Sequence, residues 1–137
     1  MHWEIGHLQW GFVYVLMPLE VDFMNHVILI GRLTGTPEIV TTESGTKRTV
    51  VTLAVPRTYK NQEGLYDTDF LRCILWNGIA QRTTEYCKKG DVVCVRGRLQ
   101  VRHYTNENEE TKFVTEVIVE NIAFVSSSKE NKEKNGD

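Results

Sequence analysis

The residues best suited to chemistry in this sequence are aromatic and basic side chains at every second position. One row contains Phe70, Arg72, Ile74 and Trp76, and a second contains Arg96, Arg98, Gln100, Arg102 and Tyr104. Residues two apart in a β-strand share a face. Aromatic faces stack on flat rings and guanidinium groups bind anions, so the rows suit non-covalent binding of a ligand that has both.

Groups that would indicate catalysis or a metal site do not form motifs. The four histidines are His2, His7, His26 and His103, and they make no HxxxH pair or Cys/His cluster. The sequence has no GxSxG, Walker or GxGxxG motif, and its three cysteines include no CxxC pair. We therefore expect a protein that is not an enzyme, with no catalytic residues, no metal and no cofactor. The cysteine pattern fits a reduced cytoplasmic setting.

The hydrophobic pattern predicts five strands and one helix. The strands are expected over residues 26–34, 47–55, 69–76, 91–104 and 112–125. The helix follows the third strand, with Asn77 as its N-cap and Gly90 as its stop. A first strand interrupted by Gly31 can pair twice. This order predicts an all-β protein with an OB-fold, a five-stranded Greek-key barrel with one helix between strands 3 and 4.

The barrel determines which way each row points. Its interior takes aliphatic side chains, and an unpaired arginine inside would carry a large desolvation cost. The residues predicted to point inward are Leu71, Cys73, Leu75, Val95, Leu99 and Val101. The aromatic and arginine rows then point outward, with Ile74 as an apolar floor between Phe70 and Trp76.

An outward aromatic face beside arginines matches the needs of single-stranded nucleic acid. Unpaired bases stack on aromatic rings at roughly 1–3 kcal/mol each, and cations follow the phosphates. The net charge of the chain is −2, but residues 88–104 carry five basic residues against one acid. Tyr59 and Tyr104 lie at expected hairpin ends, where each could fold over a bound strand. The alternative explanation of the outward aromatics is a subunit interface, or Trp76 packed under the helix.

Four segments resemble the family of bacterial single-stranded DNA-binding proteins. They are VILIGRLTGTPE, RTVVTLAVPR, DFLRCILWNGIAQRTTEYCKKGDVVCVRGRLQVRHY and FVTEVIVENIAFV. The resemblance implies a homotetramer that binds single-stranded DNA in replication, recombination and repair, in the cytoplasm at the nucleoid. The aromatic stacking positions it implies are Tyr59, Phe70, Trp76 and Tyr104. The basic positions it implies are Arg32, Arg57, Lys60, Arg72, Lys88, Arg98 and Arg102.

The predicted domain plan is an extension at 1–23, an OB-fold domain at 24–125 and a disordered polar tail at 126–137. The apolar run at 10–19 is too short to cross a membrane. We interpret the extension as translated from an upstream start, with packing on the domain or an interaction arm as alternatives. Family tails usually end in an acidic tip that recruits replication and repair proteins. This sequence ends in KENKEKNGD, without that tip, so replication and repair proteins stay possible partners but their recruitment through the tail is in doubt.

Two other functions fit the same residues. One is a different nucleic-acid-binding OB-fold module, such as an RNA binder or a primosome accessory protein. The other is an assembly module whose outward aromatic residues make subunit contacts alone.

Overall fold

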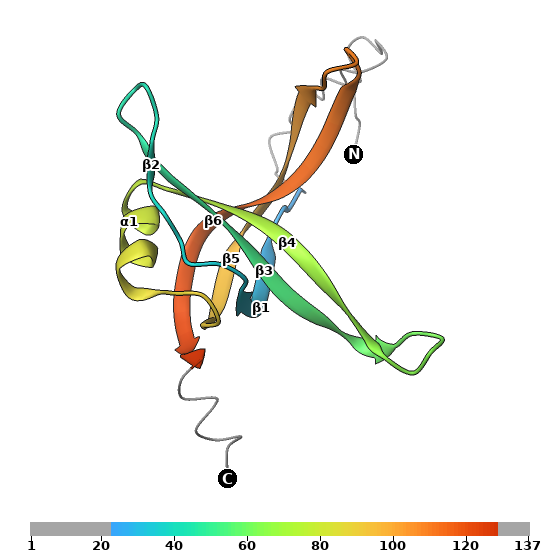
Figure 1. Ribbon diagram of the computed structural model, residues 1–137. Helices are drawn as coiled ribbons and strands as arrows, with labels where there is room; N and C mark the ends of the chain where they lie inside the picture. The colour runs from blue at the N-terminus through green and yellow to red at the C-terminus, as the bar shows by residue number, and fades with distance from the viewer. Residues whose placement is uncertain (1–22, 129–137) are drawn as a thin grey trace.

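The structure of this chain is a computed structural model that describes residues 23–128 (Figure 1). The described residues form six strands and one helix. Their bounds are β1 Val27–Leu33, β2 Val40–Thr41, β3 Lys47–Lys60, β4 Tyr66–Trp76, α1 Asn77–Tyr86, β5 Val92–Thr105 and β6 Thr111–Ser126. The predictions for residues 1–22 and 129–137 fall outside the described residues.

The sheet closes into a barrel because β1 pairs along both of its edges. Residues 27–32 pair with β5 and residues 32–33 pair with β3, and the other strands follow in the order β5-β6-β4-β3-β2. A Cβ added at Gly31 would lie 2.8 Å from Val55 Cγ2 and 2.9 Å from the Ala54 carbonyl oxygen, so glycine permits the close approach of β3.

This arrangement confirms the predicted all-β barrel with a single helix. The helix was expected between strands 3 and 4. It follows the fourth strand of the structure because the two-residue strand β2 precedes β3.

Aliphatic side chains that alternate along the strands fill the barrel. The largest fully buried apolar side chains are Leu33, Leu53, Leu75, Val93 and Val95. Cys73 is also buried, as predicted, and Leu71 is half-buried. Burial raises the pKa of the Cys73 thiol to about 12, so this thiol behaves as a small core group rather than a nucleophile.

The prediction that Leu99 and Val101 point into the barrel is wrong. These side chains are 44% and 57% exposed, whereas Val95 on the same face of β5 is fully buried. The reason is that β5 and β6 stay paired beyond the barrel, as far as Thr105 and Thr111 (Figure 1). The face that is internal at Val95 therefore emerges into solvent along this hairpin.

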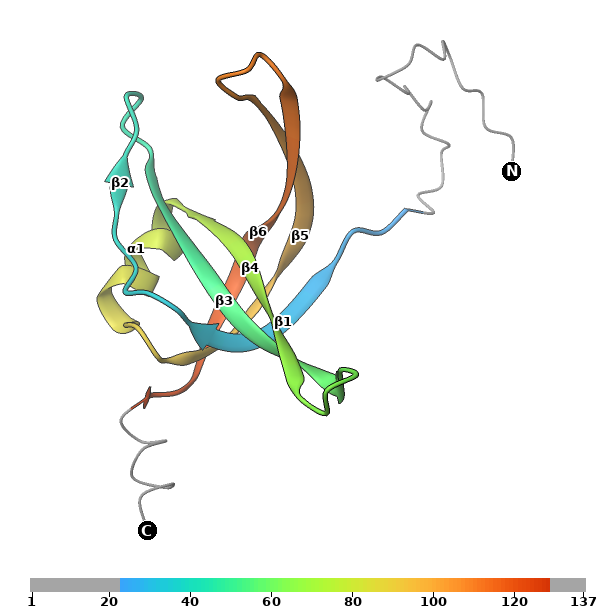
Figure 2. The ribbon, with the colours of Figure 1, turned by 45° about the vertical axis from the view of Figure 1, so that its right-hand side comes forward.

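Two hairpins project from the barrel, and we call them the β3–β4 arm and the β5–β6 arm. They extend in different directions in both ribbon views (Figures 1 and 2). At their base β4 pairs in parallel with β6 through Cys73 with Val117 and Ile74 with Ile118. No further pairs between β4 and β6 follow in the part of the chain that the structure describes, so the two arms diverge from this short junction.

The tips of the two arms have the same construction. In the β3–β4 arm, Asn61 Oδ1 accepts hydrogen bonds from the backbone N–H groups of Glu63 and Leu65, at 2.9 and 3.0 Å. In the β5–β6 arm, Asn106 Oδ1 accepts hydrogen bonds from two backbone N–H groups at the same spacing, both at 3.0 Å. An asparagine side chain that binds its own turn in this way defines the turn without a contact to the barrel.

Helix α1 covers one end of the barrel and buries Ala80 and Thr83 there. The prediction that Asn77 caps this helix is wrong. Asn77 is the first helical residue, its φ is 54°, and the helix start has no side-chain cap hydrogen bond. Within residues 23–128, no helix has the length and apolar content needed to cross a bilayer.

Candidate nucleic-acid interface

The first predicted row lies on the outward face of β3 and β4. Residues directly opposite in an antiparallel pair share a face, and the outward pairs are Arg48 with Trp76, Val50 with Ile74, Thr52 with Arg72 and Ala54 with Phe70. Phe70 is 67% exposed and Trp76 is 36% exposed, while Ile74 is buried between them. Two rings and one arginine of β4 are thus presented on one surface.

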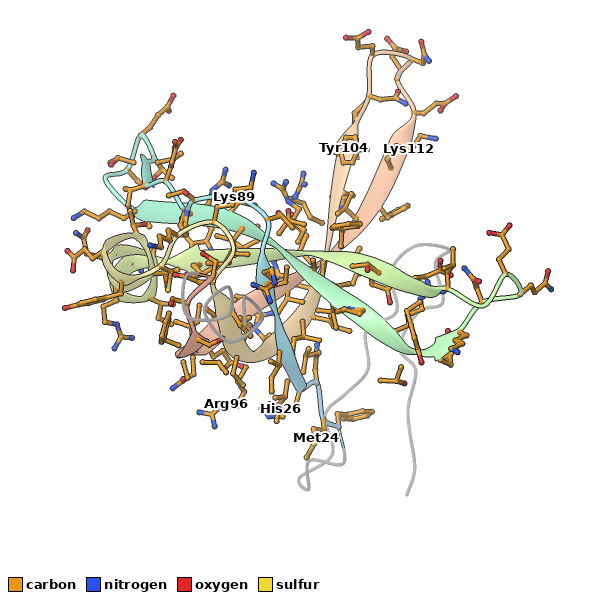
Figure 3. The ribbon with its side chains drawn as sticks, turned by 60° about the horizontal axis from the view of Figure 1, so that its bottom comes forward. Met24, His26, Lys89, Arg96, Tyr104 and Lys112 are labelled. Atoms are coloured by element: carbon orange, nitrogen blue, oxygen red, sulfur yellow. The ribbon has the colours of Figure 1, made fainter. Side chains whose placement is uncertain are left out.

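The second predicted row runs from the barrel onto the β5–β6 arm. Tyr104 lies opposite Lys112 of β6, and Figure 3 shows both on this arm, well away from Arg96 and His26 on the barrel. Arg96 pairs with Ile28 of β1 on one side and with Asn121 of β6 on the other. The row therefore divides, and Gln100 and Arg102 are the members that face the first row.

The two rows meet in a hollow of about 230 Å³, which we call the hollow. Four strands contribute to it: β3, β4, β5 and β6. Its lining residues are Arg48, Arg72, Ile74, Trp76, Gln100, Arg102, Glu116 and Ile118. Three guanidinium groups and one carboxylate leave a positive balance of charge beside an aromatic ring.

The carboxylate of the hollow belongs to Glu116, which is only 4% exposed. Its Oε1 accepts a hydrogen bond from Arg102 Nε at 3.0 Å, and its Oε2 accepts one from Arg72 Nε. The Arg102 hydrogen bond, helped by that from Arg72, lowers the pKa of Glu116 although burial opposes the shift. The same contact raises the pKa of Arg102. Glu116 and Arg102 therefore both stay charged at neutral pH.

Sequence reasoning missed Glu116. The available signal was an acid between two apolar residues of the same strand face, Val114 and Ile118, since such an acid needs a partner if it is buried.

Arg48 is a second residue that sequence reasoning missed. Its guanidinium carbon lies 5.7 Å from the centre of the Trp76 ring, within the range of a cation–π contact. Its Nε is buried and has no hydrogen-bond partner among the described residues. Only the β3–β4 register places Arg48 opposite Trp76, and the sequence alone does not specify that register.

Arg57 and Tyr59 lie on the β3–β4 arm. Arg57 Nη2 forms an ion pair with Asp69 at 2.9 Å, and its Nη1 lies 3.8 Å from Asp67. The hydrogen bond with Asp69 raises the pKa of Arg57 and lowers that of Asp69. Arg57 therefore has acidic partners that a bound anion would have to replace. Tyr59 is exposed two residues further along.

The remaining predicted basic residues are distributed around this surface. Lys60 Nζ lies 5.9 Å from the Tyr66 ring, and Arg102 lies 5.6 Å from the ring of Tyr104. Arg98 Nη1 donates to Gln100 Oε1 at 2.7 Å. Elsewhere, Arg32 of β1 pairs with Ala54, and its Nη1 donates to the Gly90 carbonyl at 2.7 Å.

Lys88 lies in the loop between α1 and β5. The hollow thus gathers Trp76, Arg72 and Arg102 from the predicted set, and the others lie outside it.

Comparison with known proteins is consistent with this surface. The model of the Single-strand binding protein family matches residues 24–125. The chain is 43% identical over 101 residues to Single-stranded DNA-binding protein B of Bacillus subtilis strain 168, which covers 74% of this chain and 89% of that protein. It is 40% identical over 102 residues to Single-stranded DNA-binding protein 2 of Listeria innocua, covering 74% and 64%. Single-stranded DNA-binding protein A of Bacillus subtilis is 42% identical over 102 residues, with 74% and 59% covered.

Proposed function

This chain belongs to the Single-strand binding protein family, and from that premise we propose that it binds single-stranded DNA without reading the base sequence. It acts by binding rather than by catalysis, and its role is to protect single strands in replication, recombination and repair. Such a role places it with the DNA, in the cytoplasm at the nucleoid. The observation that carries the proposal is the hollow, where an exposed ring and three arginines converge.

The proposed contacts divide into stacking and phosphate binding. Bases stack on the four predicted aromatic residues, Tyr59, Phe70, Trp76 and Tyr104, all of which are exposed. Phosphates are bound by the predicted basic residues, with Arg72 and Arg102 at the centre. Arg57 contributes after a phosphate replaces its acidic partners. Duplex DNA fits this surface poorly because its bases are already stacked on one another.

Affinity for labelled oligo(dT) should fall as salt is raised. Each phosphate contact on a single strand releases counterions, so the logarithm of affinity should decrease by about 0.7 per contact for each tenfold rise in salt. Fluorescence anisotropy between 50 mM and 500 mM salt measures this slope. A binding constant that does not change with salt would contradict phosphate binding.

Competition in the same assay separates DNA from its alternatives. Unlabelled poly(dT) should displace the probe at lower concentration than poly(U) or duplex DNA of equal length. Displacement by poly(U) at equal or lower concentration would favour an RNA-binding module instead.

We also propose that the chain forms a homotetramer, as the family resemblance implies. The support from the molecule is an exposed apolar surface on β1, where Ile28 and Ile30 point away from the barrel. Exposed aliphatic side chains that share one strand face are typical of subunit contacts. Neither isoleucine lines the hollow, so assembly through this surface would leave the hollow itself accessible.

Light scattering should give the mass of four chains, each of 15.8 kDa. The Ile30→Glu substitution should shift the protein to smaller species because a charge would be buried between subunits. Leu65→Glu is the matched control, since Leu65 is about as exposed, at 62% against 59%, and lies near the tip of the β3–β4 arm. A wild-type mass of one chain would rule out the tetramer.

A further inference from the structure

We propose that Glu116 is a positioning residue of the DNA site, which holds Arg72 and Arg102 in the orientation that meets phosphate. This inference rests on the proposed function, because it assigns a role within the same hollow. Glu116 acts through the two arginines and does not itself contact the DNA.

The location of Glu116 suits this role. The parallel pairing of β4 with β6 includes Cys73 with Val117, and Arg72 and Glu116 directly precede these residues at the point where the two strands separate. Across the β5–β6 arm, Glu116 lies opposite Gln100, two residues from Arg102. One carboxylate therefore joins an arginine of the β3–β4 arm to an arginine of the β5–β6 arm.

The contacts leave the outer ends of both arginines available. Each arginine donates to Glu116 through Nε, and the additional Arg102 Nη2 contact is long, at 3.5 Å. The side chain of Glu116 is 5% exposed, whereas those of Arg72 and Arg102 are each 46% exposed. A guanidinium group has five N–H donors, so most donors of each arginine can still reach a phosphate. The carboxylate is thus buried beneath the groups that it orients.

A carboxylate in an anion-binding hollow has two opposing effects. Its charge repels phosphate, and its hydrogen bonds fix two flexible side chains. The Glu116→Gln substitution removes the charge and nearly preserves the shape, so the sign of the change in affinity shows which effect is larger. If repulsion dominated, the variant would bind DNA more tightly and its salt dependence would be steeper. If positioning dominates, the variant binds more weakly, because the amide has one acceptor oxygen and presents N–H donors to an arginine.

The test is oligo(dT) anisotropy with Glu116→Gln and the matched control Glu120→Gln. Glu120 is an exposed acid of the same strand, so the control makes the same change in net charge. We expect Glu116→Gln to bind about tenfold more weakly, the loss typical of a charge-assisted hydrogen bond. Its salt slope should fall by about 0.7 for each arginine that no longer meets a phosphate. Glu120→Gln should bind as the wild type does. Equal or tighter binding by Glu116→Gln would overturn the proposal.

Two further measurements exclude general damage to the fold. Glu116→Gln should cause no further loss of affinity when added to the Arg72→Gln/Arg102→Gln variant, because these arginines are the only side chains through which it is proposed to favour binding. A tenfold loss in that background would overturn the proposal. If Glu116→Gln fails to fold, Glu116→Asp keeps the charge but shortens the side chain, and it should weaken binding with a smaller salt slope. Unchanged affinity of Glu116→Asp would also overturn the proposal.

The failure of this inference differs from the failure of the proposed function. In the first case the wild-type protein still binds oligo(dT) with a salt-dependent affinity. In the second case the wild-type titration shows no binding.

Discussion

Replacing Phe70 and Trp76 together by alanine should weaken binding of oligo(dT) by about 2–6 kcal/mol, the sum of two stacking contacts. Both rings are exposed on the outward face of β4. They lie six residues apart, roughly 20 Å along a strand, so their contributions should add. Each single variant should lose about 1–3 kcal/mol, or roughly 5- to 150-fold in affinity. Anisotropy titrations of the single and double variants measure these losses.

Tyr86→Ala is the matched control for this experiment. Tyr86 is an aromatic residue on α1 that is 75% exposed and does not line the hollow. Its removal should leave the affinity unchanged. Light scattering on the same samples tests the assembly alternative, which predicts that the double variant loses its oligomer. An intact oligomer with full DNA affinity would contradict stacking on these rings.

Gly97→Ala should strongly destabilise the barrel. A Cβ at this position would lie 2.0 Å from the carbonyl oxygen of Ile118 and 2.9 Å from its carbonyl carbon. These are backbone atoms of the neighbouring strand β6, so relief of the contact requires the strands to move apart. We expect the free energy of unfolding to fall by about 1–3 kcal/mol or more, as in overpacked cores. Urea unfolding followed by circular dichroism measures the change.

Gly35→Ala serves as the control for Gly97→Ala. A Cβ at Gly35 has no neighbour within 4 Å, so the substitution should change stability little. Equal stability of the two variants would show that β5 and β6 are not as close at Gly97 as described.

Alternation along the strands was sufficient to predict which residues of β4 face outward. Both faces of β4 are largely apolar, but arginine is costly to bury and aliphatic side chains fill a small barrel, so the arginine row of β5 gave the rule that oriented Phe70, Arg72 and Trp76. The double pairing of the first strand was also predictable, because Gly31 interrupts an otherwise continuous apolar run. These features depend on local pattern alone.

Features that depend on non-local geometry were not predictable in the same way. Leu99 and Val101 continue the alternation of Val95, and nothing in that alternation marks where β5 leaves the barrel. Glu116 meets Arg72 only because β4 and β6 pair in a particular parallel register. Arg48 meets Trp76 through the register of β3 with β4. Knowing which residues share a strand face was therefore enough to identify the rings and the central arginines of the candidate site. It was not enough to identify Glu116, which contacts the two arginines, or Arg48, which contacts the Trp76 ring.

The short junction between β4 and β6 gives the β5–β6 arm the mechanics of a lever. Its eight β5 residues from Arg98 to Thr105 span roughly 25 Å, so a rotation of about 10° at the base moves the tip by roughly 4 Å. Tyr104 lies near the moving end, whereas Trp76 adjoins the helix at the fixed end. A rotation of that size would displace Tyr104 and leave Trp76 in place. The two proposed stacking rings would then differ in how readily they adjust to bases of different size.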